Sequence, residues 1–158
     1  MMMENYRSKM MKLVIKAKLP SLNEYQDACR ANKFRGAKMK ADVDETIGWF
    51  IRSAMQKGLL KPTDKACRYR FVWHERTYRR DPDNICSAKK FIFDALQKQG
   101  VIPKDSRRYV KGFTDDFEDS DIRQLLPGLP YTVPPKPARP DFLAVSSASI
   151  VAAACERD

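Results

Sequence analysis

The sequence has little histidine and no closely spaced cysteines. His74 is its one histidine, and the four cysteines, at positions 29, 67, 86 and 155, are far apart and form no Cys-x-x-Cys pair. A zinc site built from Cys and His needs such spacing, so the sequence argues against one. It also argues against catalysis by a pair of histidines. We expect the thiols to be free and mostly buried.

Long hydrophobic runs are also missing. No stretch of about 18 apolar residues is present, as a membrane-spanning helix would require. The first residues, Met-Met-Met-Glu-Asn, lack the apolar centre of a signal peptide. We therefore expect a cytoplasmic protein with no membrane partner. With 158 residues, 43% of them hydrophobic, the chain is long enough for one domain with a real core.

Positive charge is abundant and unevenly distributed. The formal net charge is +10, and a basic surface of this kind selects anionic partners, above all nucleic acid. Residues 1–114 carry 26 basic and 12 acidic side chains, whereas residues 115–158 carry 4 and 8. An acidic run at 115–121, interpreted as a solvated face or linker, precedes many prolines. We therefore expect a domain at 1–121 and a Pro-rich, extended or flexible tail at 122–158.

The hydrophobic pattern of the first 121 residues predicts both strands and helices. Ser21 and Glu24 form a capping box at the start of one helix. Gly58 and Gly100 are placed to end the two longer helices. The pattern predicts an α+β fold, in which a small mixed sheet of three or four strands packs against two or three helices. The expected strands are 12–19, 68–75 and 109–113, and the expected helices are 21–31, 37–57 and 84–99.

The stretch Arg-Arg-Asp-Pro-Asp-Asn at 79–84 carries the strongest chemical signal. Asp81 and Asp83 stand two residues apart at the start of an expected helix, and Asp105 follows that helix and a turn. Converging carboxylates repel one another unless a cation lies between them, and Mg²⁺ prefers oxygen ligands of this kind. We therefore predict that Asp81, Asp83 and Asp105 form a catalytic Mg²⁺ site, in which Mn²⁺ could substitute.

The helix expected at 84–99 would place further polar residues beside this site. Positions 83, 87, 90 and 94 share one face of a continuous helix. Lys90 on that face could neutralise charge on a phosphate during hydrolysis or orient the attacking water. Asp94 and Asn84 are assigned supporting roles. Basic segments around the site are expected to bind DNA phosphates. The predicted phosphate-binding residues are Arg35, Lys38, Arg79, Arg80, Lys89, Arg107 and Arg108.

The same residues also have simpler interpretations. Asp-Pro-Asp-Asn is an ordinary turn, in which Asp83 or Asn84 would cap the helix. The pair Lys90 and Asp94 could be a solvated pair on a helix face. Conversely, Asp115 or Asp116 in the acidic run could supply a fourth metal ligand.

These motifs resemble the RusA family of Holliday junction resolvases. The Pro-Ser-Leu-Asn-Glu-Tyr segment at 20–25 and Gly-Ala-Lys-Met-Lys at 36–40 fit the same family, and the similarity covers about residues 12–117. The motifs that carry the resemblance are Arg-Asp-Pro-Asp-Asn at 80–84, Lys-Lys-Phe-Ile-Phe-Asp-Ala-Leu at 89–96, and Gly-Val-Ile at 100–102 followed by Asp105.

The resemblance implies a small homodimeric endodeoxyribonuclease, of a kind often encoded by phages and prophages. Such an enzyme resolves four-way DNA junctions by paired symmetric nicks in recombination and repair, with Mg²⁺ and without a small-molecule cofactor. The resemblance implies metal ligands at Asp81, Asp83 and Asp105 and an essential lysine at Lys90, with Lys89 as the alternative. Family members end in a β-rich segment, for which the tail offers only 131–133 and 142–145 as candidates.

Two other functions are compatible with the sequence. One is a non-catalytic basic DNA-binding protein, which needs the basic surface but no metal. The other is a metal nuclease that acts on forks, flaps or RNA, because the chemistry of such sites is shared and substrate shape is not encoded in short motifs. The number of metal ions and the base preference at the cut are equally outside these motifs.

Overall fold

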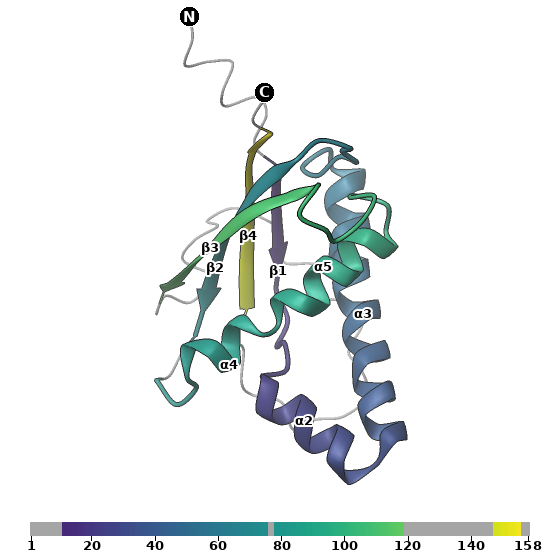
Figure 1. Ribbon diagram of the computed structural model, residues 1–158, viewed down its shortest axis with the longest axis vertical. Helices are drawn as coiled ribbons and strands as arrows, with labels where there is room; N and C mark the ends of the chain where they lie inside the picture. The colour runs from purple at the N-terminus through teal and green to yellow at the C-terminus, as the bar shows by residue number, and fades with distance from the viewer. Residues whose placement is uncertain (1–10, 76–77, 119–146, 156–158) are drawn as a thin grey trace, which may run out of the picture.

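The computed structural model of the protein describes residues 11–75, 78–118 and 147–155 (Figure 1). Strands and helices are both present, so the predicted α+β class is confirmed. None of the helices in these ranges is long and apolar enough to cross a membrane. The elements, in chain order, are β1 (Met11–Ile15), α2 (Leu22–Ala31), α3 (Lys33–Gln56), β2 (Cys67–His74), α4 (Pro82–Cys86), α5 (Lys89–Lys98), β3 (Val110–Glu118) and β4 (Ser147–Cys155).

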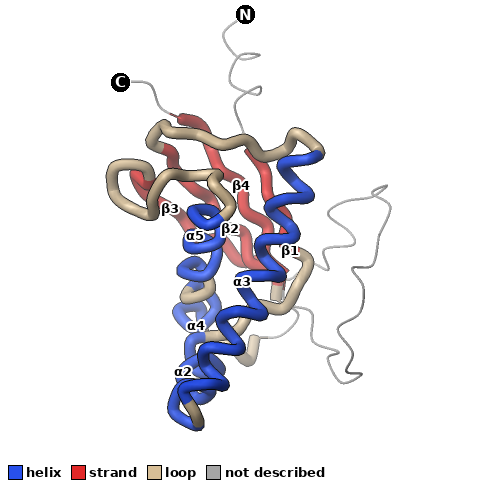
Figure 2. Tube along the Cα trace, turned by 90° about the vertical axis from the view of Figure 1, so that its right-hand side faces the viewer, coloured by secondary structure: helices blue, strands red, loops and turns tan. Residues whose placement is uncertain are grey.

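The strands form one mixed sheet in the order β1-β4-β2-β3. β4 is antiparallel to both of its neighbours, and β3 is parallel to β2. The helices lie together on one side of this sheet (Figure 2). Because β3 runs parallel to β2, the end of β3 lies beside the end of β2, from which the chain continues toward Asp81. The edge strand β3 therefore reaches the end of the sheet where α4 begins.

The central strand β4 comes from the tail. It pairs with β1 from Met11↔Ala152 to Ile15↔Ala148, and with β2 from Cys67↔Cys155 to His74↔Ser147. The two segments named as candidates for the final strand, 131–133 and 142–145, lie outside the described residues. Residues 147–155 of the tail are extended and paired within the sheet. The predicted boundary near residue 122 therefore does not separate the tail from the sheet.

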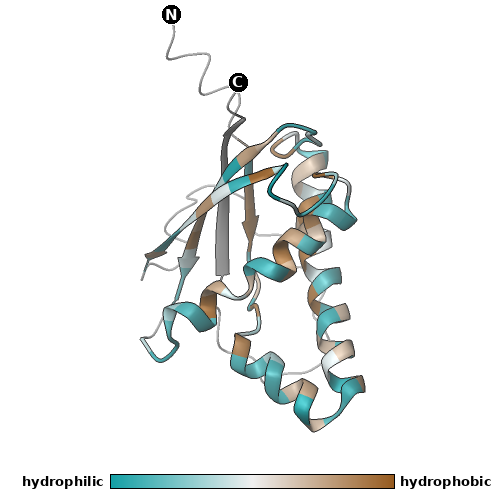
Figure 3. Ribbon diagram, viewed as in Figure 1, coloured by the Kyte–Doolittle hydropathy of each residue, from teal (hydrophilic) through white to brown (hydrophobic). Residues whose placement is uncertain are grey.

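The core lies between the sheet and the helices. The helices contribute buried apolar side chains to it. On α3 these are Ile47, Ile51 and Ala54, and on the segment 84–99 they include Ile85, Ala88, Ile92, Ala95 and Leu96. Hydrophobic residues line β1, whereas hydrophilic residues predominate on α2 (Figure 3). The largest fully buried side chains are Phe71, Ile15, Ile47, Ile51, Ile92 and Ile102.

Most of the predicted helix boundaries are confirmed, with two differences. The capping box of Ser21 and Glu24 is present, and Gly58 and Gly100 have φ of 70° and 75°, as expected where helices end. α3 begins four residues earlier than predicted, because the side chain of Asn32 accepts a hydrogen bond from the backbone of Phe34 at 2.8 Å. The single helix expected at 84–99 is divided into α4 and α5.

Candidate active site

Asp81 and Asp83 occupy the start of α4 with their carboxylates in solvent. Asp81 is the N-cap residue, with an extended backbone, but its side chain makes no capping hydrogen bond. Pro82 takes the first helical position, where its fixed φ suits a helix start. The interpretation that Asp83 or Asn84 caps this helix is therefore wrong. Both Asp81 and Asp83 are exposed, so their oxygens are accessible to a cation.

Lys90 contacts two carboxylates, one on its own helix and one in the loop that follows that helix. Its Nζ lies 2.6 Å from Asp94 Oδ1 and 3.6 Å from Asp105 Oδ2. The backbone N–H of Asp105 donates to Gln97 Oε1 at 2.9 Å, which holds the loop after α5 against that helix. A second lysine, Lys40 of α3, approaches Asp94 at 3.4 Å. The fold thus brings Asp105 back to Lys90, as predicted from the turn that follows the helix.

These contacts keep the cluster charged. The hydrogen bond to Asp94 raises the pKa of Lys90, and the charges of Asp94 and Asp105 add to that effect. Burial alone would raise the pKa of Asp94, but the hydrogen bond and charge of Lys90, together with the charge of Lys40, lower it overall. At neutral pH the cluster therefore presents an ammonium group between two carboxylates.

Lys89 belongs to a different and more buried cluster. It forms an ion pair with Asp115 of β3, and its Nζ lies 4.3 Å from the centroid of the Phe113 ring. Trp73 Nε1 donates to the same carboxylate at 2.9 Å. The Lys89 side chain is 15% exposed, whereas that of Lys90 is 69% exposed. The geometry therefore favours Lys90 over Lys89 as the lysine that can meet a substrate.

Asp115 is thus part of the folded domain. Burial alone would raise the pKa of Asp115, but hydrogen bonds from Lys89 and Trp73 lower it overall. Residues 115–118 belong to β3 and are therefore not a linker, but the side chains of Asp116 and Glu118 are 47% and 41% exposed, as expected of a solvated face. The sequence suggested Asp115 only as a possible fourth metal ligand, because an aspartate on the same strand face as Phe113 and Phe117 interrupts the apolar pattern of a strand.

Cys86 lies at the end of α4, within the influence of two carboxylates. Burial raises the pKa of its thiol to about 11, and the negative charges of Asp115 and Asp83 act in the same direction. The thiol is therefore neutral at physiological pH, which makes it a poor nucleophile and a poor metal ligand.

The break between α4 and α5 separates residues that we expected on one helix face. Ser87 Oγ donates to the Asn84 carbonyl at 2.7 Å, and α5 begins only at Lys89. The predicted face of positions 83, 87, 90 and 94 is therefore interrupted, and of these only Lys90 and Asp94 form a close pair. Within the part of the chain that the structure describes, no three His, Cys, Asp or Glu side chains form a group able to hold a metal ion.

The donor chemistry of Asp81, Asp83 and Asp105 nevertheless suits Mg²⁺. All three offer carboxylate oxygens, and Mg²⁺ in phosphate-processing sites is usually held by one or two carboxylates, several waters and the substrate phosphate. Such a site does not need a closed cage of protein ligands before the substrate binds. The exposed pair Asp81 and Asp83 matches that requirement, and Asp105, which lies beside Lys90, offers a further carboxylate.

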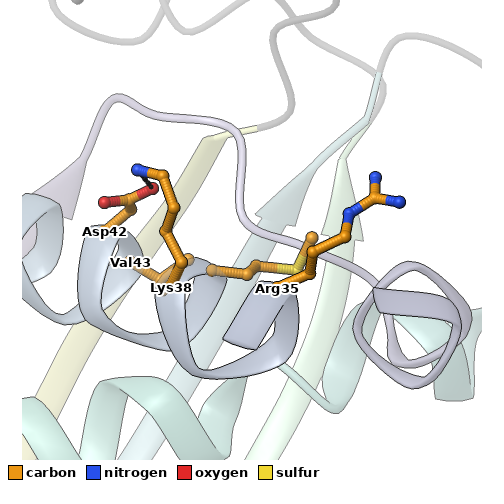
Figure 4. Close-up of a pocket in the computed structure, with 5 residues that line it drawn as sticks. Arg35, Lys38, Asp42 and Val43 are labelled. Atoms are coloured by element: carbon orange, nitrogen blue, oxygen red, sulfur yellow. Dashed lines mark hydrogen bonds and ion pairs between the residues drawn. The ribbon is translucent and has the colours of Figure 1, made fainter. Parts of the chain in front are cut away.

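Five of the seven predicted phosphate-binding residues are exposed. Arg35 and Lys38 line an open groove on α3 with Met39, Asp42 and Val43 (Figure 4). The residues with exposed side chains are Arg35, Lys38, Arg79, Arg107 and Arg108.

Arg80 is used within the fold. Its guanidinium binds Glu75 at 3.1 Å and the Leu19 carbonyl at 3.2 Å, and lies 3.7 Å from Glu24. Arg80 and Lys89 therefore connect elements of the protein, and neither is retained as a phosphate contact.

The chain was compared with known proteins on the basis of its sequence. A scan against models of known protein families finds no match, and a search of curated proteins finds no similar sequence.

Proposed function

We propose that the protein is a Mg²⁺-dependent, structure-specific endodeoxyribonuclease of the RusA type, which cuts four-way DNA junctions as a homodimer. The observation that carries the proposal is the position of Asp105. The loop after α5 returns it to Lys90, which lies 3.6 Å from Asp105 and 2.6 Å from Asp94. The exposed carboxylates of Asp81 and Asp83 lie at the start of the preceding helix, α4.

The reaction would be hydrolysis of a phosphodiester. Mg²⁺ bound by Asp81, Asp83 and Asp105 would supply polarisation of the scissile phosphate and stabilise the leaving oxygen. Water would form the new bond to phosphorus, and the bond to the 3′-oxygen would break. Because its pKa is raised, Lys90 stays protonated and can neutralise charge that accumulates on the phosphate. Asp94 holds this ammonium group in place.

The rest of the proposal concerns recognition. Arg35, Lys38, Arg79, Arg107 and Arg108 are exposed cations that suit backbone phosphates. Binding through phosphates should weaken steeply as salt increases. A two-fold dimer would present two identical sites to the two symmetry-related strands of a junction.

Cleavage of a labelled synthetic four-way junction tests the proposal. Linear duplex and a splayed fork serve as controls, each with Mg²⁺ and with EDTA. Asp83→Asn is the matched variant, because an exposed carboxylate can be replaced without disturbing the core. We expect paired symmetric nicks in the junction that require both Mg²⁺ and Asp83. Cutting that persists in the Asp83 variant, or that spares the junction and attacks forks or RNA, would contradict the proposal.

A non-catalytic DNA-binding protein is the second candidate. It is favoured by one observation: no three potential ligands are grouped for a metal among the described residues. This candidate predicts tight binding of the junction with no cutting under any metal condition. The same cleavage assay, run beside a binding assay in EDTA, therefore separates the two functions.

A further inference from the structure

The hairpin of α2 and α3 projects beyond the end of the sheet, away from the core (Figure 1). A single residue, Asn32, makes its turn. The Asn32 backbone N–H donates to the Ala28 carbonyl at 3.2 Å, and its carbonyl accepts from the Arg35 N–H at 3.0 Å. Its side chain accepts from the Phe34 N–H at 2.8 Å. The turn is therefore held to both helices.

The two helices also meet closely just beyond the turn. Gly36 is buried, and a Cβ at this position would lie 2.5 Å from Cys29 Sγ and 3.1 Å from Cys29 Cα. Such an approach is available only to glycine. The tip of the hairpin is therefore a rigid support, and a side chain placed on it is presented in a fixed position.

Phe34 is the side chain presented there. It is 71% exposed, although a large apolar side chain normally gains free energy by burial. The Lys33 ammonium lies 5.4 Å from its ring centroid. The ring thus extends into solvent at the first turn of a helix of 24 residues. Its exposure at the end of a rigid projection, rather than on a broad surface, is typical of a group that contacts a partner.

The surroundings of Phe34 define the chemistry of that partner. Arg30, Lys33, Arg35 and Lys38 are exposed cations on the same hairpin. Arg30 and Lys38 are partly offset by neighbouring carboxylates, at 3.7 Å and 3.3 Å. No described acidic side chain pairs with Lys33 or Arg35. An exposed aromatic ring with cations on the same hairpin suits nucleic acid, because phosphates meet the cations and a base can stack on the ring.

An intact duplex offers this ring no base to stack on, because its bases are covered by their neighbours. A branch point offers exposed base faces. We propose that Phe34 stacks on an unpaired or unstacked base at the branch point of the bound DNA, while Lys33 and Arg35 hold the adjacent phosphates. This inference rests on the proposed function and adds the means by which branched DNA is distinguished from duplex.

The test measures binding of a four-way junction and of linear duplex in EDTA, where no cleavage occurs. The variants are Phe34→Ala and Phe34→Tyr, with Leu59→Ala as the control, because Leu59 is an exposed apolar residue just beyond the far end of α3. We expect Phe34→Ala to weaken junction binding about 5- to 100-fold, the range of one base–aromatic stack, and to leave duplex binding within about twofold. Phe34→Tyr and Leu59→Ala should bind the junction like the wild type.

A fluorescent adenine analogue at the branch point gives an independent readout, since its emission changes when the base is stacked on a ring. Wild type should change that emission and Phe34→Ala should not. The inference would be overturned if wild type and Phe34→Ala bound the junction equally well, or if Phe34→Ala lost the same affinity for junction and duplex. Either result would leave the proposed function in place. A wild type that binds no junction at all would overturn both.

Discussion

Two adjacent lysines at the start of α5 have different surroundings, and this difference predicts different effects of mutation. Lys90 is mostly exposed between Asp94 and Asp105, whereas Lys89 is mostly buried beside Asp115. We expect Lys90→Ala to lower the rate of junction cleavage about 100- to 1,000-fold, the cost of removing one charge-stabilising group from a transition state. Single-turnover cleavage under saturating enzyme measures this effect.

Lys89→Ala is the matched control. It leaves the partly buried carboxylate of Asp115 without its cation, so we expect a lower free energy of unfolding, by about 1 to 3 kcal/mol. Lys90→Ala should unfold at nearly the wild-type urea concentration, because exposed ion pairs contribute little. The opposite pattern, in which Lys89→Ala stays folded and loses cleavage, would assign the essential lysine to Lys89.

Asp115 is expected to make stability depend on pH. Its pKa in the folded protein is lower than the ordinary value of 3.8, because the hydrogen bonds from Lys89 and Trp73 outweigh the effect of burial. The contribution of ionised Asp115 to the free energy of unfolding is therefore fully present above pH 3.8. It is lost as the pH falls through the pKa that Asp115 has in the folded protein. Asp115→Asn should lower the free energy of unfolding at pH 7, by about 1 to 2 kcal/mol.

Urea denaturation of wild type and Asp115→Asn at several pH values measures this dependence. The difference in the free energy of unfolding should narrow below pH 3.8, where this carboxyl is protonated in the unfolded chain but still ionised in the folded protein. A difference that stays constant from neutral to acid pH would mean that Asp115 stabilises the fold by its shape rather than its charge. Asp94, whose pKa is also lowered, is unchanged in both proteins and so does not affect the comparison.

At the scale of elements, two buried glycines of α3 provide a test of helix packing. A Cβ at Gly36 would meet the backbone of Cys29 at 3.1 Å as well as its sulfur at 2.5 Å. A Cβ at Gly48 would meet only the flexible ends of Gln99 and Arg52. We expect Gly36→Ala to destabilise the protein by about 1 to 3 kcal/mol, because the α2–α3 contact must open.

Gly48→Ala serves as the control within the same helix. It should be neutral or stabilising by up to about 1 kcal/mol, because alanine favours a helix interior and the contacting side chains can move. Thermal unfolding of the two variants measures both effects. Equal melting temperatures would show that α2 and α3 are free to separate, and would remove the basis for a rigid hairpin tip.

The elements also explain which predictions from sequence succeeded. The capping box at Ser21 and the glycine stops depend on residues a few positions apart, so the local sequence contains their cause. The division of the helix at Ser87 was not predicted, because the apolar spacing continues across it. The local signal is one hydrogen bond, from the Ser87 hydroxyl to the Asn84 carbonyl. The acidic end of β3 was missed because aspartates are rare in strands and its partners Trp73 and Lys89 are distant in sequence.

The candidate site, like the fold, was predictable only in part. The oxygen ligands and the lysine follow from residue types and spacing, and the return of Asp105 to Lys90 follows from the turn after the helix. The ion pairs of Arg80 within the fold could not be predicted. They depend on how the fold brings Glu24 of α2 and Glu75, just after β2, to the same arginine. Charge alone does not distinguish an arginine that binds DNA from one that joins two elements.

For the whole molecule, the decisive feature is that a central strand lies near the end of the sequence. β4 joins β1 to β2, and without it neither strand has a neighbour on that side. The sequence predicted no strand there, because 147–155 consists of serine, alanine and cysteine with one Ile-Val pair, and lacks the bulky alternating pattern of a strand. Its position in the sheet depends on pairing with β1 and β2, which are far from it in sequence.

Truncation tests this arrangement. A chain that ends at residue 146 lacks β4, so both of its hydrogen-bonded ladders are lost. At about 1 kcal/mol for each hydrogen bond, their loss is comparable to the entire stability of a small domain, about 5 to 15 kcal/mol. We therefore expect this chain to have no cooperative thermal transition by circular dichroism. A chain that ends at residue 155 retains β4 and should melt like the full protein. If the shorter chain melts cooperatively near the wild-type temperature and cuts a junction, then β4 is dispensable and the active domain is complete within the first 146 residues.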